Sequence, residues 1–259
     1  MNKLQLQVAS GFYLLPRFRP KLQDLIKPSA KYLALLGNVH QIVESKTHRE
    51  SISEVCNRFE KVFYVAGTRE HYVNCLYPSM IDKEVLVADF KSWASSLKNL
   101  YFLDDEAVDL DGFRIIGTTL WSNIPPSSVK LVEAYLTAYR LISSRGQPIR
   151  AETTNLWHRE AVSLLKKEIS ESTKPVIVLT HHAPMMKKDV SPDCLTLACQ
   201  TAFGTSLTEM FDPKVKLWCF GQEHWTCDLV YNKTRVVSNP WTGVNYRDDL
   251  VIELLSDPQ

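Results

Sequence analysis

The chain has 259 residues, 45% of them hydrophobic, and its 30 lysines and arginines nearly balance its 29 aspartates and glutamates. This composition supports a sizeable buried core, and the balanced charge gives no strong signal for nucleic-acid binding. No run approaches the ~20 consecutive apolar residues that span a bilayer, so we expect no membrane partner. The six cysteines form no Cys-x-x-Cys pair, and the first residues lack the apolar core of a secretion signal. Both features predict reduced thiols and a cytoplasmic protein.

Short apolar runs, most of them ending at glycine, alternate along the chain with stretches of helical spacing. Such runs are typical of strands buried on both faces, and the alternation indicates a layered α/β sheet. The predicted strands are Leu4–Val8, Tyr32–Leu36, Val62–Ala66, Val176–Leu179 and Val215–Phe220. The predicted helices are Thr47–Lys61, Asp82–Lys98, Ser128–Ser143 and Glu152–Ser170.

Two hairpin-like stretches interrupt this pattern. Ala107–Trp121 carries an Asp-Gly turn between apolar runs, and Cys227–Asn239 turns at Asn232-Lys233. They predict antiparallel strands mixed into the sheet, or two sheets packed together. Ser143–Asn155 is predicted to be an exposed loop, and no linker or repeat divides the chain, so a single domain over residues 1–259 is expected.

Polar residues gather directly after the predicted strands. If the strands are neighbours in one sheet, the loops beyond their carboxyl ends meet at one crevice. Five of the seven histidines lie in these loops, and histidine with carboxylate is what a dinuclear hydrolytic metal centre uses. The loops are Ser10–Tyr13, Gly37–His40, Gly67–His71, Thr180–Pro184 and Gly221–His224.

In order and form, these five motifs resemble those of the calcineurin-like metallophosphoesterases. Members of that family carry, in this order along their chains, Asp-x-His, Gly-Asp, Gly-Asn-His-Glu, Thr-His-His-x-Pro and Gly-His-x-His. In the present chain the resemblance extends from Leu4 to about Trp241. It implies an α/β fold, a four-layer αββα sandwich of two mixed β-sheets. The resemblance is closest to a small subfamily with near-verbatim counterparts of "FEKVFYVAG", "DGFRIIGTTLW", "VIVLTHHAPM" and "VVSNP".

The first, second and last motifs depart from the family pattern. Gly11 and Tyr13 stand where the family has the aspartate and histidine of the first motif, and Asn38 stands at the aspartate that bridges both metals. In the last motif Gln222 replaces the first histidine, and His224 keeps the second. The resemblance therefore implies a degenerate active site that has lost both metal-site carboxylates.

The third motif departs as well. Thr68 stands at the metal-binding asparagine and Arg69 at the histidine that stabilises the leaving group, while Glu70 is kept. His71 lies two residues beyond the expected position of that histidine. Arg69 adds a positive charge beside the pocket, which opposes the binding of a cation.

The residual metal positions implied by the resemblance are His181, His224 and Asn38. Each of the two metal positions keeps about one good donor, although His182 could replace His181 as a ligand. Divalent cations need anionic oxygens or several imidazoles to offset dehydration. No cofactor is therefore expected, and if one binds we expect a single divalent zinc, manganese or iron ion.

Three functions remain open. The first is a catalytically inactive pseudoenzyme that binds a protein or a phosphate-bearing ligand, with Arg69 and His182 as the ligand-binding residues. The second is a residual or repurposed metal-dependent phosphoesterase with one metal, for which Glu70, His71 and Glu223 are the candidate catalytic residues. The third is a structural interaction scaffold whose surface acts in place of the pocket.

Overall fold

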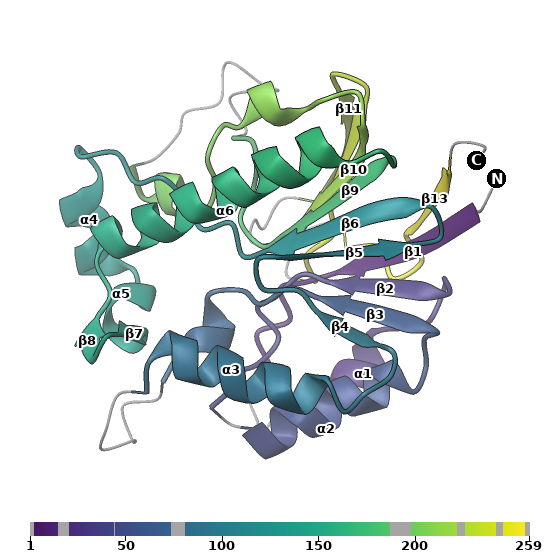
Figure 1. Ribbon diagram of the computed structural model, residues 1–259. Coiled ribbons are helices and arrows are strands. Elements are labelled where there is room, and N and C mark those ends of the chain that lie inside the picture. The colour runs from purple at the N-terminus through teal and green to yellow at the C-terminus, as the bar shows by residue number, and fades with distance from the viewer. Residues whose placement is uncertain are drawn as a thin grey trace.

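Two β-sheets form the centre of the molecule in the computed structural model, which describes residues 3–14, 21–43, 45–73, 81–186, 198–221, 226–241 and 246–256 (Figure 1). One sheet has five strands in the order β13-β1-β2-β3-β4, and the other has six in the order β11-β12-β10-β9-β6-β5. The five-stranded sheet contains β1 (Lys3–Ala9), β2 (Tyr32–Leu35), β3 (Lys61–Tyr64), β4 (Leu100–Phe102) and β13 (Val251–Leu255). The six-stranded sheet contains β5 (Glu106–Leu110), β6 (Phe113–Thr118), β9 (Val176–Thr180), β10 (Val215–Phe220), β11 (Cys227–Tyr231) and β12 (Thr234–Ser238).

Both sheets are mixed. In the five-stranded sheet β1, β2, β3 and β4 pair in parallel, and β13 runs antiparallel to β1. In the six-stranded sheet β6, β9, β10 and β12 are parallel, while the hairpin partners β5 and β11 are antiparallel. Both predicted hairpins are confirmed, since the turn residues at Asp111-Gly112 and Asn232-Lys233 all have positive φ, as a two-residue turn of this hand requires.

Four layers result from the way the sheets bury their faces (Figure 1). The inner faces pack on each other through one apolar cluster, to which Leu6 and Phe63 contribute from one sheet and Ile177 and Leu217 from the other. Helices α1 (Leu22–Leu25), α2 (Ser45–Cys56) and α3 (Lys83–Ala94) cover the outer face of the five-stranded sheet, and α6 (Ala151–Glu171) covers the six-stranded sheet. The αββα sandwich predicted from the sequence is confirmed.

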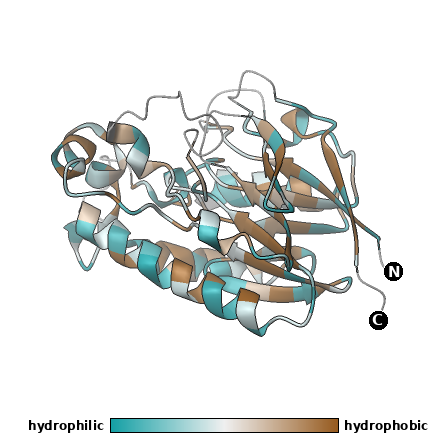
Figure 2. Cartoon of the chain, turned by 90° about the horizontal axis from the view of Figure 1, so that it is seen from above, coloured by the Kyte–Doolittle hydropathy of each residue, from teal (hydrophilic) through white to brown (hydrophobic). Residues whose placement is uncertain are grey.

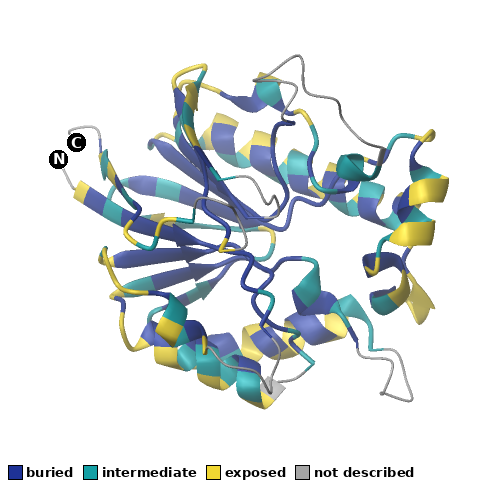
Figure 3. Ribbon diagram, turned by 180° about the vertical axis from the view of Figure 1, so that it is seen from behind, coloured by how far each residue is buried: buried dark blue, intermediate teal, exposed yellow. Residues whose placement is uncertain are grey.

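The hydrophobic residues follow these layers. Figure 2 shows the strands as largely hydrophobic and the helices as alternating between hydrophobic and hydrophilic residues, and Figure 3 shows the buried residues concentrated in the strands. Strands covered on both faces have no polar side, which is why their sequences read as short apolar runs. Within the described ranges, no helix has the length and apolarity needed to cross a membrane.

Several predicted boundaries were wrong. The first predicted helix extends too far, because α2 ends at Cys56 and Lys61 already begins β3. The predicted helix Ser128–Ser143 is two helices, α4 (Val129–Tyr135) and α5 (Ala138–Leu141), because Leu136 adopts an extended conformation. Both short helices pack on the same apolar cluster. The apolar residues of this stretch therefore have the sequence spacing that is typical of one long helix, which explains the wrong prediction.

The predicted exposed loop Ser143–Asn155 contains regular structure. Two-residue strands β7 (Ser143–Ser144) and β8 (Gln147–Pro148) pair across Arg145 and Gly146, which both have positive φ. Helix α6 then begins at Ala151, whose amide donates to the Glu133 carboxylate at 2.9 Å. This carboxylate satisfies one of the unpaired amides at the helix N-terminus, so the helix starts inside the segment expected to be a loop.

The motif-bearing strands are divided between the two sheets, and are not neighbours in a single sheet. Their carboxyl ends nevertheless meet where the sheets cross. The Gly221 amide, just after β10, donates to the His181 carbonyl at 3.0 Å. A Cβ atom at Gly221 would lie 2.0 Å from the Leu36 carbonyl oxygen at the end of β2. The absence of a side chain at Gly221 thus allows the two strand ends to approach.

We predict that Gly221→Ala destabilises the protein strongly, because the obstructing atom belongs to the backbone and no rotamer change relieves the contact. The cost should exceed the ~3 kcal/mol at the upper end of ordinary overpacking. The comparison variant is Gly146→Ala, where a Cβ meets nothing within 4 Å and only the left-handed conformation is strained, at a cost of ~1–2 kcal/mol. Urea denaturation measures both, and equal costs would contradict this explanation.

Candidate functional site

A single carboxylate connects the loops that follow β2 and β3. Glu70 lies in the short 3-10 helix η1 (Arg69–His71) and is fully buried. Its Oε2 accepts from the Asn38 amide at 2.9 Å and the Gly67 amide at 2.8 Å, while Oε1 accepts from the Val39 amide at 2.7 Å and the Tyr64 hydroxyl at 3.0 Å. Burial raises the pKa of Glu70, and the donated hydrogen bonds oppose that rise. This candidate catalytic residue is therefore fully engaged in holding the backbone.

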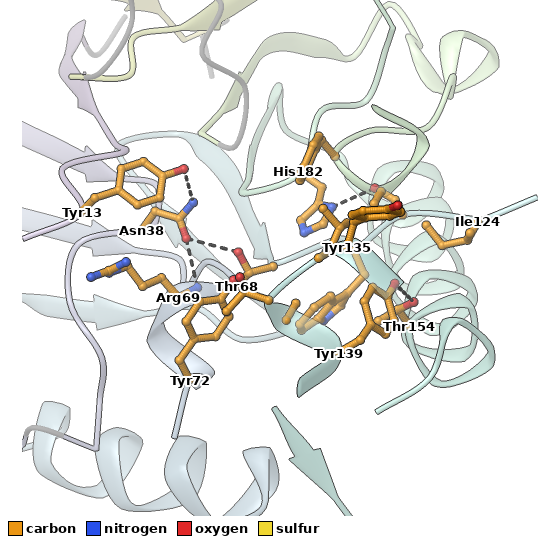
Figure 4. Close-up of a pocket in the computed structure, with 17 residues that line it drawn as sticks. Tyr13, Asn38, Thr68, Arg69, Tyr72, Ile124, Tyr135, Tyr139, Thr154 and His182 are labelled. Carbon is orange, nitrogen blue, oxygen red and sulfur yellow. Dashed lines mark hydrogen bonds between the residues drawn. The ribbon is translucent and has the colours of Figure 1, made fainter. Parts of the chain in front are cut away.

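Asn38 is engaged in the same way by its side chain (Figure 4). Its Nδ2 donates to the Tyr13 hydroxyl at 2.9 Å, and its Oδ1 accepts from the Arg69 amide at 3.0 Å and from the Thr68 hydroxyl at 3.3 Å. A cation at this oxygen would have to compete with two protein donors. Asn38 also has a positive φ of 56°, so the backbone that presents it is itself unusual for a residue with a side chain.

Arg69 and His182 border the same cavity from different sides. The Arg69 guanidinium lies over the ring of Tyr13, 5.7 Å from its centroid, which is within the range of a cation–π contact. Figure 4 shows the guanidinium directed away from His182, with Asn38 and Thr68 between them. The two predicted ligand-binding residues could therefore contact one ligand only from opposite sides.

His181 is held where the two sheets meet. Its Nδ1 lies 2.8 Å from the Leu36 carbonyl oxygen, and because a carbonyl only accepts, the proton is on Nδ1. Nε2 is then the acceptor nitrogen, as in a histidine that binds metal. Cβ atoms at Gly37 and Gly67 would lie 2.6 and 2.5 Å from this ring, so both glycines leave space for it.

His182 is 2% exposed and lies against Trp121, with ring centroids 5.6 Å apart. Its Nδ1 is 2.7 Å from the Ser122 hydroxyl, and its Nε2 has no hydrogen-bond partner among the described residues. Burial, and then the neighbouring His181 and His158, hold the pKa of His182 well below its usual range. The imidazole is therefore neutral at physiological pH.

His71 is separated from the cavity. It is fully buried and stacks on Trp121 at 5.8 Å, and it does not line the cavity described below. Burial, followed by Lys83 and His181, lowers the pKa of His71 well below its usual range. In this position His71 packs against Trp121 and is not part of the cavity lining.

The last motif cannot be placed. Gln222, Glu223 and His224 lie outside the described residues. Among the residues that are described, no group of three or more His, Cys, Asp or Glu side chains could hold a metal ion. The described donors do not fit a dinuclear centre, because Asn38 and Glu70 are occupied by protein hydrogen bonds. The expectation about metal content stays a prediction.

A cavity of about 230 Å³ opens beside Asn38 (Figure 4). One end is polar, and the other is formed by aromatic and aliphatic side chains that the sequence motifs did not reveal. Because these side chains come from segments far apart in the chain, their clustering had no local sequence signal. The lining residues are Tyr13, Asn38, Thr68, Arg69, Tyr72, Trp121, Ser122, Ile124, Tyr135, Leu136, Thr137, Ala138, Tyr139, Thr154, His182, Ala202 and Phe203.

The two mixed sheets enclosed by helices, with polar loops at their carboxyl ends, define the metallophosphoesterase fold. Among solved structures, the phosphopantetheinyl hydrolase PptH from Mycobacterium tuberculosis superposes with a TM-score of 0.74 at 16% identity, covering 100% of this chain and 98% of the other. A putative 5'-nucleotidase from Staphylococcus aureus gives a TM-score of 0.52 at 14% identity, covering 93% of this chain and 49% of the other. At these identities the likeness shows the fold alone.

Sequence comparison adds a relative without a described activity. An uncharacterized protein of Acanthamoeba polyphaga mimivirus is 28% identical over 219 residues, which is 80% of this chain and 77% of the viral protein. No family model matches the chain. The resemblance to phosphoesterases therefore extends to the fold, and activity has to be argued from the site.

We predict that Glu70→Gln destabilises the protein by ~1–3 kcal/mol, because the new NH2 group leaves at least one buried amide donor without an acceptor. Urea denaturation measures the loss. The matched control is Glu60→Gln, since Glu60 is exposed and its carboxylate pairs with Lys31 at 3.2 Å on the surface; that change should stay within ~0.5 kcal/mol. An equally small loss of unfolding free energy in both variants would contradict the structural role of Glu70.

Stability should also fall as the pH decreases from 6.5 towards 3. Burial, and then Arg69, lowers the pKa of His40 from 6.5 to about 4, and burial, then His40 and Arg49, lowers that of His48 to about 3. In this interval the two histidines bind protons in the unfolded chain but not in the folded chain. Each histidine therefore lowers the free energy of unfolding by up to ~1.4 kcal/mol for each pH unit of acidification. His48→Phe removes one such group and should give a shallower dependence of unfolding free energy on pH. An unchanged slope would contradict the assignment.

Proposed function

We propose that the protein binds a phosphate-bearing ligand at the cavity beside Asn38 and does not hydrolyse it. The observation that carries this proposal is the hydrogen bonding of Asn38. The resemblance places this residue where the family has the carboxylate shared by two metals. Here the position is neutral, and its oxygen accepts from Arg69 and Thr68.

Hydrolysis by two metals depends on anionic oxygens that hold the cations and on a metal-activated hydroxide. Gly11 and Tyr13 bring no carboxylate or imidazole to the first motif. Glu70, the one carboxylate of the described motifs, is surrounded by four donors and turned towards the backbone. A pair of divalent cations would meet little compensating charge, which argues against turnover.

Binding is supported by what remains in the cavity. Arg69 supplies a fixed positive charge, and guanidinium groups bind phosphate with directed hydrogen bonds. Thr68 and Ser122 add hydroxyls, and His182 adds a ring nitrogen. These groups line a cavity that is accessible to a small molecule. A phosphate-bearing ligand suits them better than the protein partner or surface scaffold that the sequence also allowed.

The second candidate is a phosphoesterase with one metal, and it is favoured by the tautomer of His181. With its proton on Nδ1, the ring presents Nε2 as a donor to a metal. The resemblance pairs this position with His224. A zinc site with an open position needs three such ligands, and Glu223 would be a candidate for the third.

Elemental analysis and a phosphodiesterase assay on the same preparation separate the two candidates. We predict metal far below one equivalent per chain after exposure to Zn²⁺, Mn²⁺ or Fe²⁺, and turnover of bis(p-nitrophenyl) phosphate no faster than the blank. One equivalent of metal, with activity that disappears together with the metal in His181→Ala and His224→Ala, would establish the single-metal enzyme instead. Activity that persists in both variants would indicate a contaminant.

A further inference from the structure

The apolar end of the cavity extends into a hydrophobic cluster that is distinct from the clusters beside the two sheets. Leu136 and Phe203 pack on this cluster, line the cavity and stay partly exposed. Protein interiors are normally filled by side chains, so an open volume bordered by a core cluster offers apolar surface to a ligand. The buried members of the cluster that line the cavity are Trp121, Ile124, Ala138, Tyr139 and Ala202.

The hydroxyl groups at this end are paired within the protein. The Thr154 hydroxyl donates to the Ala151 carbonyl at 3.0 Å, and the Tyr139 hydroxyl lies 3.1 Å from the same Thr154 oxygen, to which it can donate (Figure 4). The Ser122 hydroxyl lies 2.7 Å from Nδ1 of His182. A ligand group at the apolar end is therefore held by van der Waals contacts and burial, and not by these hydroxyls.

Charge is confined to the other end. Arg69 carries the fixed charge among the described lining residues, and its guanidinium lies over Tyr13. Figure 4 shows Tyr139, Thr154 and Ile124 on the opposite side of the cavity from this guanidinium. Burying a charged group without a partner is costly, so the group that fits the apolar end is uncharged.

The Trp121 ring forms a fixed part of the wall. Leu120 and Trp121, directly after β6, have positive φ angles of 67° and 50°, which non-glycine residues keep only when their surroundings impose them. The indole stacks on His71 at 5.8 Å and lies 4.8 Å from Trp157. A ring held in this way can pack against a flat ligand group with little loss of side-chain freedom.

The volume limits the size of the group. An apolar cavity of ~150 Å³ is large enough to hold one benzene ring. The cavity of about 230 Å³ therefore has room for a single ring with a short substituent. Tyr135 of α4 lines the cavity and is 73% exposed, so the cavity reaches the surface at this residue and a ligand can enter.

We infer that the apolar end of the cavity is a binding site for an uncharged, flat apolar group of about one ring, which binds there without any phosphate. This inference goes beyond the proposed function, because it concerns the opposite end of the cavity from Arg69. Its support is the core cluster, the internally paired hydroxyls and the fixed Trp121 ring, none of which contributes to phosphate binding.

Titration calorimetry on the full chain tests the inference with two probes of the same shape. Toluene is uncharged, and N-methylpyridinium has nearly the same size and outline but a fixed positive charge. Toluene should bind with a dissociation constant of about 1 mM or lower, as expected of a small ligand that is well buried. N-methylpyridinium should bind at least roughly tenfold more weakly, because desolvation of its charge outweighs a contact with the aromatic rings.

Two measurements locate the probe. Nuclear Overhauser contacts between the toluene methyl group and the Trp121 indole should appear in the unchanged protein. Ala202→Leu should fill the apolar end and weaken toluene at least roughly tenfold, since the added side chain occupies the volume of the probe. The matched control is Ala134→Leu, because Ala134 is an exposed residue of α4 that does not line the cavity. Thermal unfolding shows whether both variants fold.

The outcomes separate this inference from the proposed function. No heat of binding for toluene near its solubility limit, or equal or tighter binding of N-methylpyridinium, would overturn the uncharged apolar site. Unchanged toluene affinity in a folded Ala202→Leu protein, or the absence of contacts with Trp121, would overturn its location. Titration with inorganic phosphate is read separately: failure of phosphate to bind would count against the proposed function alone, whatever the result for toluene.

Discussion

The buried carboxylate of Glu70 is the constraint on which the rest of the site depends. It collects three backbone amides from the loops after β2 and β3, together with the Tyr64 hydroxyl, and thereby fixes how these loops lie against each other. The backbone conformation of Asn38 follows from this arrangement, because its amide is held by Glu70 while its side chain turns to the Arg69 amide. A negative charge surrounded by donors needs no metal for its stability, so this part of the site can persist whatever happens to the metal ligands.

Packing explains a second group of motif residues. The His181 ring fits between Gly37 and Gly67, and Gly221 lets the end of β10 approach Leu36. Each of these residues contributes to the packing where the strand ends of the two sheets meet, whatever chemistry takes place there. The positions that depart from the family pattern are those to which the resemblance gives a role in holding cations or, for Arg69, in stabilising the leaving group. The resemblance in the third and fourth motifs thus reflects requirements of the fold, which is why a recognisable motif is weak support for activity in this chain.

How far the sequence predicted the structure depended on the range of the interactions involved. The strands and both hairpins were predictable because apolar runs and turn residues such as Asp111-Gly112 act locally. The break at Leu136 was not, because its two helices bury their residues in one cluster and so preserve helical spacing. At the site, the departure of Asn38 from the pattern was visible in the sequence, but its hydrogen bonds were not. The position of Trp121 was equally hidden, since it depends on the ring contact with His71 and on the hydrogen bond between His158 and the carbonyl of the preceding residue, Leu120.

The distribution of charge favours anion binding over cation binding at this cavity. Burial keeps the imidazole of His182 neutral, and Asn38 contributes no charge, so the fixed charge among the described lining residues is that of Arg69. Its guanidinium lies over the Tyr13 ring, which limits its freedom to swing into water. In a partly dehydrated cavity this charge repels a divalent cation and attracts a phosphate more strongly than it would in bulk solvent. The proposed binding of phosphate in place of metal therefore requires no change in the fold, only the replacement of side chains at the ends of four strands.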